Sequence, residues 1–380
     1  MLMEERRMKQ SDVLKIFNDH SSILTLPIRI KSGEEFYKTL YVRWNRFIKM
    51  LQRIPELADC IPFAEKSVVL LKSIIKAYYK ADYQTTSKRI LELINMLTTV
   101  KNSRLITDLN SLYIDVESKQ WFRGRITNAQ PLTRNSMRHI PANERAKIGN
   151  NRYSINGIPC LYIGNSVQCC WEEFGRPSLD TFWVCRYRPQ KTVKVLNLST
   201  TGNDIVNART YLKCVADSTV PYDDAVKEFF SNWILQSACS VVIEESGRKF
   251  LEEYVIPQLL MQNIKLFKVD GIMYFSTRVA FGYQDDSSWL SRNIAIPAFD
   301  TTGFNGKTGL YSKKIDSLFD ISHPINVGFF ANGVIPIGPK GYHESYNQAR
   351  SCAPVLYCSQ KSTYKNTLFY KCEIELQNYF

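Results

Sequence analysis

The sequence predicts an α+β protein in which an all-helical region precedes a region of short strands. Between about residues 34 and 109, apolar residues recur at steps of three and four, as they do along one face of an α-helix. From Trp121 onward, short alternating segments are separated by Pro, Gly and Asn, which is typical of strands. We therefore expect a helical domain over residues 1–115, a second domain over 116–325 and a small β-rich extension over 326–380.

The helical region contains two amphipathic segments on either side of a polar turn that we expect at residues 84–87. Their apolar positions are Leu70 or Leu71, Ile74, Ile75 and Tyr78 in the first, and Ile90, Leu91, Ile94 and Leu97 in the second. Packing within a core is the simplest role for these faces. Docking on the second domain, a homodimer contact and binding of a regulator remain open alternatives.

The second domain is expected to contain several strands and two further helices. The segment 121–126 alternates, so that Arg123 and Arg125 lie on one face, opposite Phe122, Gly124 and Ile126. Other strands are expected at 160–163, 182–187, 192–198 and 271–276. An apolar stripe that starts at Val226 predicts a helix after the strand at 192–198. Pro257 can open another helix, because proline is tolerated in a first turn.

Composition excludes several classes of protein. No apolar run approaches the roughly 20 residues of a membrane-spanning helix, and the charged start does not resemble a signal peptide. The ten cysteines form no CxxC pair, and no histidine has a second ligand at metal spacing. We expect a cytoplasmic protein with reduced thiols, no membrane partner and no metal site.

The net charge of +13 suits nucleic acid, an anionic membrane surface or a small ligand that carries phosphate. Lys and Arg are spread along the chain rather than gathered in a tail, so a solvated basic surface explains the charge equally well. This distribution disfavours nucleic acid as a partner.

The pattern of one expected helix indicates which of two adjacent glutamates is better placed to enter a binding cleft. After Ser166, a plausible N-cap, a stripe at about 100° per residue consists of Val167, Cys170, Trp171 and Phe174. Glu173 flanks this stripe, whereas Glu172 is expected to point to water. Glu173 is therefore the better candidate for a functional carboxylate.

Several motifs in order resemble the RES family, which is named for an Arg, a Glu and a Ser. FRGR (122–125) resembles the family's first arginine motif, and RYSINGIPCLY (152–162) resembles its Gly-containing stretch that ends in Leu-Tyr. Glu173 falls at the family's glutamate, eleven residues after Tyr162. EYVIPQLL (253–260) and DGIMYFS (270–276) resemble its later helix and serine strand. The resemblance covers about residues 121–324, and larger RES proteins also carry a helical N-terminal extension.

Members of this family degrade NAD⁺ and often act as toxins in bacterial toxin–antitoxin pairs, so the resemblance implies a bacterial toxin or a defence effector. The resemblance implies a fold akin to ADP-ribosyltransferases, with two small sheets around an NAD⁺ cleft, and cleavage of the nicotinamide–ribose bond. NAD⁺ would be the substrate, with phosphate or water as the nucleophile and no cofactor. The implied partner is an antitoxin or a regulatory protein. The implied catalytic residues are Glu173, Ser276 and Arg123, and the implied substrate-binding residues are Arg152, Tyr153, Tyr162 and Arg125.

The chemistry explains these residue types. Loss of nicotinamide leaves an oxocarbenium-like ribose, which a carboxylate such as Glu173 stabilises more in the transition state than in the ground state. Arginines bind pyrophosphate oxygens two at a time, and tyrosines can stack on the nicotinamide ring. Ser276 is expected to bind the ribose or position the nucleophile, because no histidine accompanies it in a motif.

Two other functions fit the same sequence. The cleft chemistry could transfer ADP-ribose to a macromolecule, because any nucleophile can attack the ribose. Alternatively, the chain is a basic nucleic-acid-binding module without catalysis, in which case the order of the motifs has no functional meaning.

Overall fold

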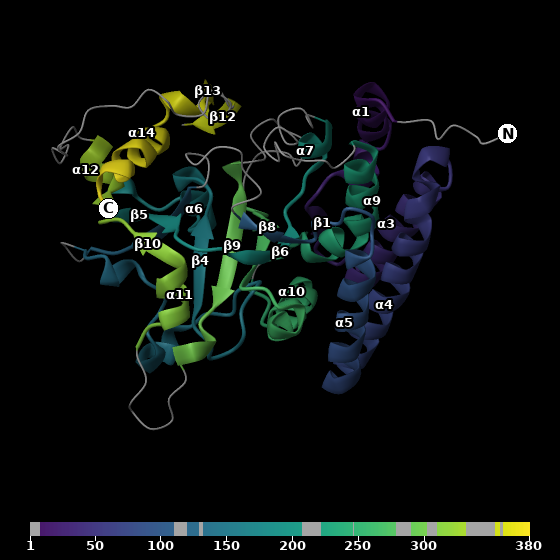
Figure 1. The fold of residues 1–380 in the computed structure, drawn as a ribbon, viewed down its shortest axis with the longest axis horizontal. Helices are drawn as coiled ribbons and strands as arrows, with labels where there is room; N and C mark the ends of the chain where they lie inside the picture. Colours follow the sequence, from purple (N-terminus) through teal and green to yellow (C-terminus); the bar gives the residue numbers. More distant parts are fainter. Residues whose placement is uncertain are drawn as a thin grey trace.

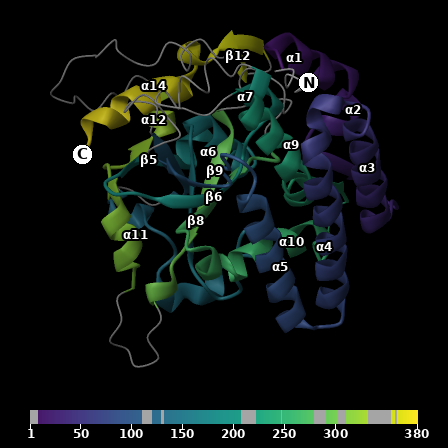
Figure 2. The same cartoon turned by 45° about the vertical axis from the view of Figure 1, so that its right-hand side comes forward.

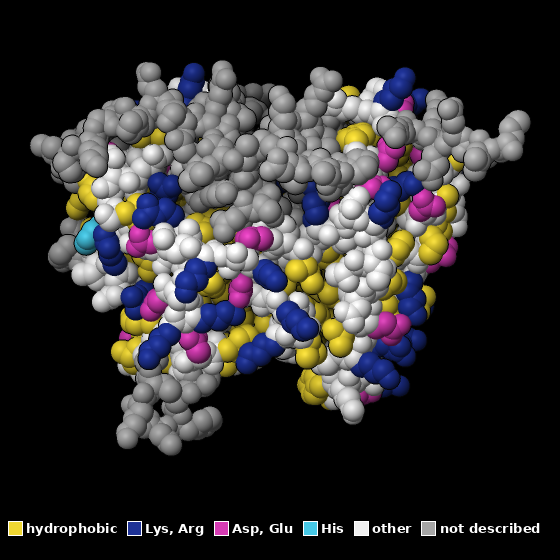
Figure 3. All heavy atoms as spheres, in the orientation of Figure 1, with side chains coloured by type: hydrophobic (Ala, Val, Ile, Leu, Met, Phe, Trp, Pro, Cys, Tyr) yellow, Lys and Arg dark blue, Asp and Glu magenta, His cyan; other side chains and the backbone are white. Residues whose placement is uncertain are grey.

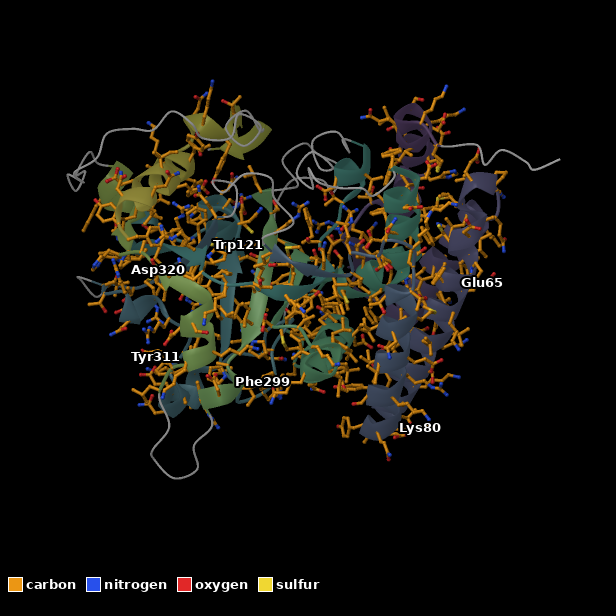
Figure 4. The ribbon with its side chains drawn as sticks, viewed as in Figure 1. Glu65, Lys80, Trp121, Phe299, Tyr311 and Asp320 are labelled. Carbon is orange, nitrogen blue, oxygen red and sulfur yellow. The ribbon has the colours of Figure 1, made fainter. Side chains whose placement is uncertain are left out.

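The computed structural model describes residues 8–109, 120–128, 132–206, 222–245, 247–278, 290–301, 310–331, 354–357 and 360–380. A mixed sheet occupies one half of the molecule, and a group of long helices occupies the other (Figure 1). Figure 4 labels Trp121, Tyr311 and Asp320 in the sheet half, and Glu65 and Lys80 on the helical side. The fold is therefore α+β, as predicted.

The expected helical region forms three long helices, α3 (Phe36–Leu51), α4 (Ile61–Tyr79) and α5 (Tyr83–Thr98). The turn between α4 and α5 lies earlier than predicted. Ala81 adopts a positive φ of 55°, and the Asp82 side chain caps α5 by accepting a hydrogen bond from the Thr85 backbone N–H (3.0 Å). The polar residues 84–87 thus belong to the first turns of α5.

These helices share a core with the rest of the chain. Helix α9 (Tyr222–Cys239) is buried around most of its surface, and α4 packs along it. Trp44 donates a hydrogen bond to Ser237 Oγ (2.8 Å), and the rings of Phe47 and Trp233 stack at 4.2 Å. The same apolar cluster continues to the sheet at Leu196 and Ile272. The domain boundaries near residues 115 and 325 stay predictions.

The main sheet has nine strands within the described residues. Along the sheet the order is β10-β5-β3-β4-β9-β8-β6-β2, with β11 also paired to β5, and only β6 and β8 run parallel. A separate parallel pair, β1 (Ile28–Lys31) with β7 (Val241–Glu244), lies against the helices. The strands of the main sheet are β2 (Ile106–Asp108), β3 (Trp121–Ile126), β4 (Cys160–Gly164), β5 (Phe182–Pro189), β6 (Lys194–Leu198), β8 (Gly271–Phe275), β9 (Arg292–Pro297), β10 (Phe319–Ile321) and β11 (Ile325–Asn326).

The strands are connected into one sheet rather than the two small sheets that we expected, but this sheet is nearly divided. Strand β3 pairs with β5 over six residues, whereas β3 and β4 share a single registered pair, Phe122 with Gly164. Strand β4 in turn pairs with β9 over five residues. Two well-paired halves therefore meet at one point. Whether this is the ADP-ribosyltransferase-like arrangement stays a prediction.

The expectation of a β-rich region after residue 325 is wrong in part. A short hairpin is present, with β12 (Pro354–Tyr357) antiparallel to β13 (Gln360–Thr363). Within the described residues of this region, it is accompanied by α12 (Val327–Ala331) and α14 (Leu368–Glu375). Thr367 caps α14 by accepting a hydrogen bond from the Tyr370 N–H (3.2 Å), so this aromatic segment is helical rather than extended. Figure 2 shows α14 above α6 and β5 at the sheet end of the molecule.

The remaining expectations concern membranes and surface charge. No helix in the described part of the chain is long and apolar enough to cross a membrane. On the face drawn in Figure 3, Lys and Arg side chains lie in separate groups among Asp and Glu.

Candidate functional site

A cleft of ≈ 320 Å³ opens where the two halves of the sheet meet. Strands β3 and β4 contribute Arg123, Gly124, Tyr162, Ile163 and Gly164 to its wall. Because the backbones of β3 and β4 pair at one position, their side chains beyond that position leave room for a ligand. The volume lies at the lower end of the range of ligand pockets, about 300–1,000 Å³.

Glu173 reaches this cleft from the last position of helix α6 (Val167–Glu173). Its Oε1 accepts hydrogen bonds from Ser276 Oγ (2.5 Å) and from Asn293 Nδ2 (2.6 Å). Its Oε2 lies 3.6 Å from Nε of Arg278, whose side chain is 57% exposed. The carboxylate is therefore fixed on one oxygen, while the other faces a cation at the mouth of the cleft.

Ser276 is fully buried at the end of β8 and does not line the cleft. Its hydroxyl donates to Glu173 and accepts a hydrogen bond from the Arg278 backbone N–H (3.2 Å). The hydroxyl thus both donates and accepts a hydrogen bond within the protein. Ser276 is placed to hold Glu173 rather than to attack a substrate.

The two arginines of β3 differ in their position. Arg123 lines the cleft, and its Nη1 donates to the backbone carbonyl of Tyr162 (2.9 Å), which joins β3 to β4 across the split. Arg125 lies on the same side of β3 but is not among the lining residues. Burial, and then the neighbouring charge of Arg123, lowers the pKa of Arg125.

Arg152 lines the cleft but is anchored within the protein. Its Nη2 donates to the carbonyl of Val241 (2.8 Å), and its Nη1 lies near the carbonyls of Cys239 and Glu253 (3.3 and 3.2 Å). The guanidinium also lies over the ring of Tyr254, 4.9 Å from its centre. Its hydrogen-bonding groups therefore hold the wall of the cleft together.

The predicted tyrosines divide between the cleft and the layer behind it. Tyr162 lines the cleft, and its hydroxyl donates to the backbone carbonyl of Tyr153 (2.6 Å). Tyr153 is buried outside the lining, with its ring 4.3 Å from that of Tyr274. A turn from Ile155 to Ile158 connects the two, with Gly157 at φ 74°, a conformation that glycine adopts without strain.

The residues on either side of Glu173 differ from the prediction in their burial. Glu172 is buried and pairs with Arg176 (2.7 Å), so the expectation that it points to water is wrong. Phe174, assigned to the buried stripe, is 46% exposed and lines the cleft. The periodicity located α6 and the Ser166 cap correctly, since Ser166 Oγ accepts a hydrogen bond from the Cys169 N–H (2.9 Å).

Thiol chemistry does not fit this cleft. Burial raises the pKa of Cys160 and of Cys170 to about 12, against the opposing effect of the Arg123 charge. Both thiols lining the cleft are therefore protonated at neutral pH and are poor nucleophiles. Among the described residues, no group of three His, Cys, Asp or Glu side chains could hold a metal ion.

Sequence reasoning missed several residues that line the cleft, and four of them bear on its chemistry. Asn293 and Arg278 contact Glu173 directly, and Tyr254 and Tyr274 add aromatic surface. Tyr254 and Tyr274 lie inside the two motifs EYVIPQLL and DGIMYFS, so their position was visible although their role was not. No local pattern marks Asn293, because its place beside Glu173 depends on the pairing of β9 with β4.

Comparisons with known proteins relate the chain to one curated protein. "Putative toxin YopC" of Bacillus subtilis (strain 168) is 26% identical over 315 residues, which are 79% of this chain and 68% of that protein. A solved structure, the M. tuberculosis MbcT-MbcA toxin-antitoxin complex, aligns over 54% of this chain and 82% of its own with 11% identity. Its TM-score of 0.25 is too low to support a statement about the fold. No protein-family model matches the sequence.

Proposed function

We propose that the chain breaks the bond between nicotinamide and ribose in NAD⁺. The observation that carries this proposal is the Glu173 carboxylate, held by Ser276 and Asn293 in a cleft that also contains Arg123 and three tyrosines. A fixed carboxylate beside cationic and aromatic groups fits a substrate that joins an aromatic cation, a ribose and a pyrophosphate. The resemblance of the motifs to the RES family supports the same reaction.

Glu173 would act on the ribose. As the bond to nicotinamide breaks, positive charge moves onto the sugar, and a preorganised carboxylate stabilises that charge without rearrangement. Ser276 and Asn293 both donate to Oε1, which leaves Oε2 as the oxygen that can face the sugar. Ser276 is then a positioning residue.

The tyrosines and arginines would bind the two ends of the substrate. Tyr162, Tyr254 and Tyr274 offer aromatic surface for nicotinamide. Arg123 and the exposed Arg278 offer positive charge to the pyrophosphate. Arg152 contributes mainly by holding the wall, since both of its terminal nitrogens already donate to backbone carbonyls. The cleft volume suits the nicotinamide riboside portion, with the adenylate outside.

The biological role that we propose is that of a toxin. The similarity to a protein named as a toxin supports this role, and an enzyme that consumes NAD⁺ in its own cell requires restraint. We therefore propose an antitoxin or a regulatory protein as its partner. No cofactor is needed, because NAD⁺ itself supplies the leaving group.

Product analysis tests this function. Purified protein is incubated with NAD⁺ that is labelled in the adenine ring, with and without phosphate, and the products are separated. Free nicotinamide together with ADP-ribose or ADP-ribose phosphate is the expected result. Nicotinamide release with label on a macromolecule would indicate transfer instead, and intact NAD⁺ would contradict the proposal.

A further inference from the structure

The C-terminal segment lies directly against the helix that carries Glu173. Helix α14 packs along α6, and the rings of Trp171 and Phe369 are 5.2 Å apart. Phe369, Cys372 and Leu376 belong to one apolar cluster with Val167 and Cys170 of α6. The segment thus covers α6 at Val167 and Trp171, neither of which lines the cleft.

A carboxylate from this segment reaches the start of α6. Glu373 is fully buried, and its Oε1 accepts hydrogen bonds from the Val167 backbone N–H (2.8 Å) and from the Tyr364 hydroxyl (2.6 Å). The first N–H groups of a helix have no partner within the helix, and the helix dipole places partial positive charge there. A buried carboxylate at this position satisfies one of these donors and is itself stabilised by the dipole.

Besides the bond to Glu373, the start of α6 is held by hydrogen bonds of Ser166, and its later residues pack on β3 and β4. The helix is seven residues long, Ser166 caps it, and the Ser166 hydroxyl donates to the carbonyl of Leu290 (2.6 Å). Glu173 lies six residues beyond Val167, about 9 Å along the axis at 1.5 Å per residue. In so short a helix, a shift or tilt of the first turn moves the last residue too.

We propose that Glu373 is a positioning residue for Glu173, and that the segment 364–376 is part of the catalytic unit. This inference rests on the proposed function, because it assigns Glu173 the catalytic role. It also predicts that a fragment ending at residue 325 lacks the support of α6 and loses activity.

The test uses the full chain with graded substitutions. Glu373→Gln keeps an oxygen acceptor for Val167 and Tyr364, whereas Glu373→Met removes it at similar size. We expect Gln to keep kcat for NAD⁺ cleavage within about threefold of the wild type. Met should lower kcat at least tenfold with KM within twofold, because only the position of Glu173 changes. Ser312→Ala is the matched control, since it removes the cap of the remote helix α11 (Lys313–Leu318).

A double-mutant cycle separates positioning from general destabilisation. In a Glu173→Gln background, Glu373→Met should lower the residual kcat less than twofold, because the group that it positions is gone. Ser312→Ala should have the same small effect in both backgrounds. A tenfold loss from Glu373→Met in both backgrounds, or no loss in either, would overturn the proposal.

Hydrogen exchange gives a readout that does not depend on activity. Glu373→Met should speed amide exchange of residues 167–174 about tenfold and leave α11 unchanged, even if NAD⁺ is not the substrate. Unchanged exchange in α6 would overturn the positioning role. If Glu373→Met does not fold, Tyr364→Phe, which removes one of the two donors, should produce a smaller change in the same direction, and no change would count against the proposal. An inactive wild type with faster exchange in the variant would refute the proposed function alone.

Discussion

Replacing Ser276 with alanine isolates the hydrogen bond that fixes Glu173. In the structure, the Ser276 hydroxyl donates to Glu173 Oε1 at 2.5 Å, and Ser276 is not among the residues that line the cleft. A hydrogen bond to a charged group contributes roughly 1.5–3 kcal/mol. At about 1.4 kcal/mol per tenfold in rate, its loss should lower kcat about 10- to 100-fold, if the bond is fully needed in the transition state.

The assay is the initial rate of nicotinamide release by Ser276→Ala, with Ser312→Ala as the control for loss of a buried serine. KM for NAD⁺ should stay within about threefold, because Asn293 still holds the carboxylate. A rate within threefold of the wild type would refute the role of this hydrogen bond. A complete loss of turnover in a folded variant would point to Ser276 as the attacking group, which would equally refute the positioning role.

Three further predictions concern the site and its support. Glu173→Gln should lower kcat about 10²–10³-fold in the same assay. Glu172→Gln, whose carboxylate pairs with Arg176 and does not line the cleft, should stay within about fivefold; equal losses would contradict the assignment. Arg152→Lys should reduce the free energy of unfolding in urea by about 2 kcal/mol, because a single ammonium nitrogen cannot take the places of both Nη1 and Nη2, which share the three carbonyls between them. A loss below about 0.5 kcal/mol would argue against this anchor. Burial lowers the pKa of His139, whose Nε2 accepts a hydrogen bond from the Ser312 N–H (2.9 Å), so the folded state favours the neutral ring. The contribution of His139 to the free energy of unfolding should therefore be fully present above about pH 6.5 and should be lost as the pH falls below it. His139→Gln should reduce the dependence of the free energy of unfolding on pH, measured by denaturant titrations between about pH 5.5 and 7.5. An unchanged dependence on pH would exclude His139 as its source.

Local patterns in the sequence predicted much of the fold. The alternation at 121–126 predicted β3 and placed Arg123 and Arg125 on the same side of it. The periodicity after Ser166 predicted α6 and its N-cap. These features depend on neighbours within a few residues, so one sequence suffices. The long helices α4 and α5 were predicted for the same reason.

The errors arise where distant segments meet. Glu172 was expected at the surface, but α6 is covered from two sides, by the sheet and by α14, so its outer face is buried as well. The region after residue 325 was expected to be β-rich, because α14 is only eight residues long, too short to show a clear helical period. Asn293 reaches Glu173 through strand pairing, and Glu373 reaches α6 from more than 200 residues away in sequence. Such contacts are properties of the folded chain.

The central claim is that Glu173 acts on the ribose of NAD⁺, and a crystal structure of the Glu173→Gln variant soaked with NAD⁺ tests it most directly. The account predicts that the side chain of residue 173 lies about 3–3.5 Å from the sugar that carries nicotinamide. It also predicts aromatic contacts from the tyrosines of the cleft to the nicotinamide ring. NAD⁺ bound elsewhere, or bound in the cleft with its adenine beside residue 173, would contradict the account.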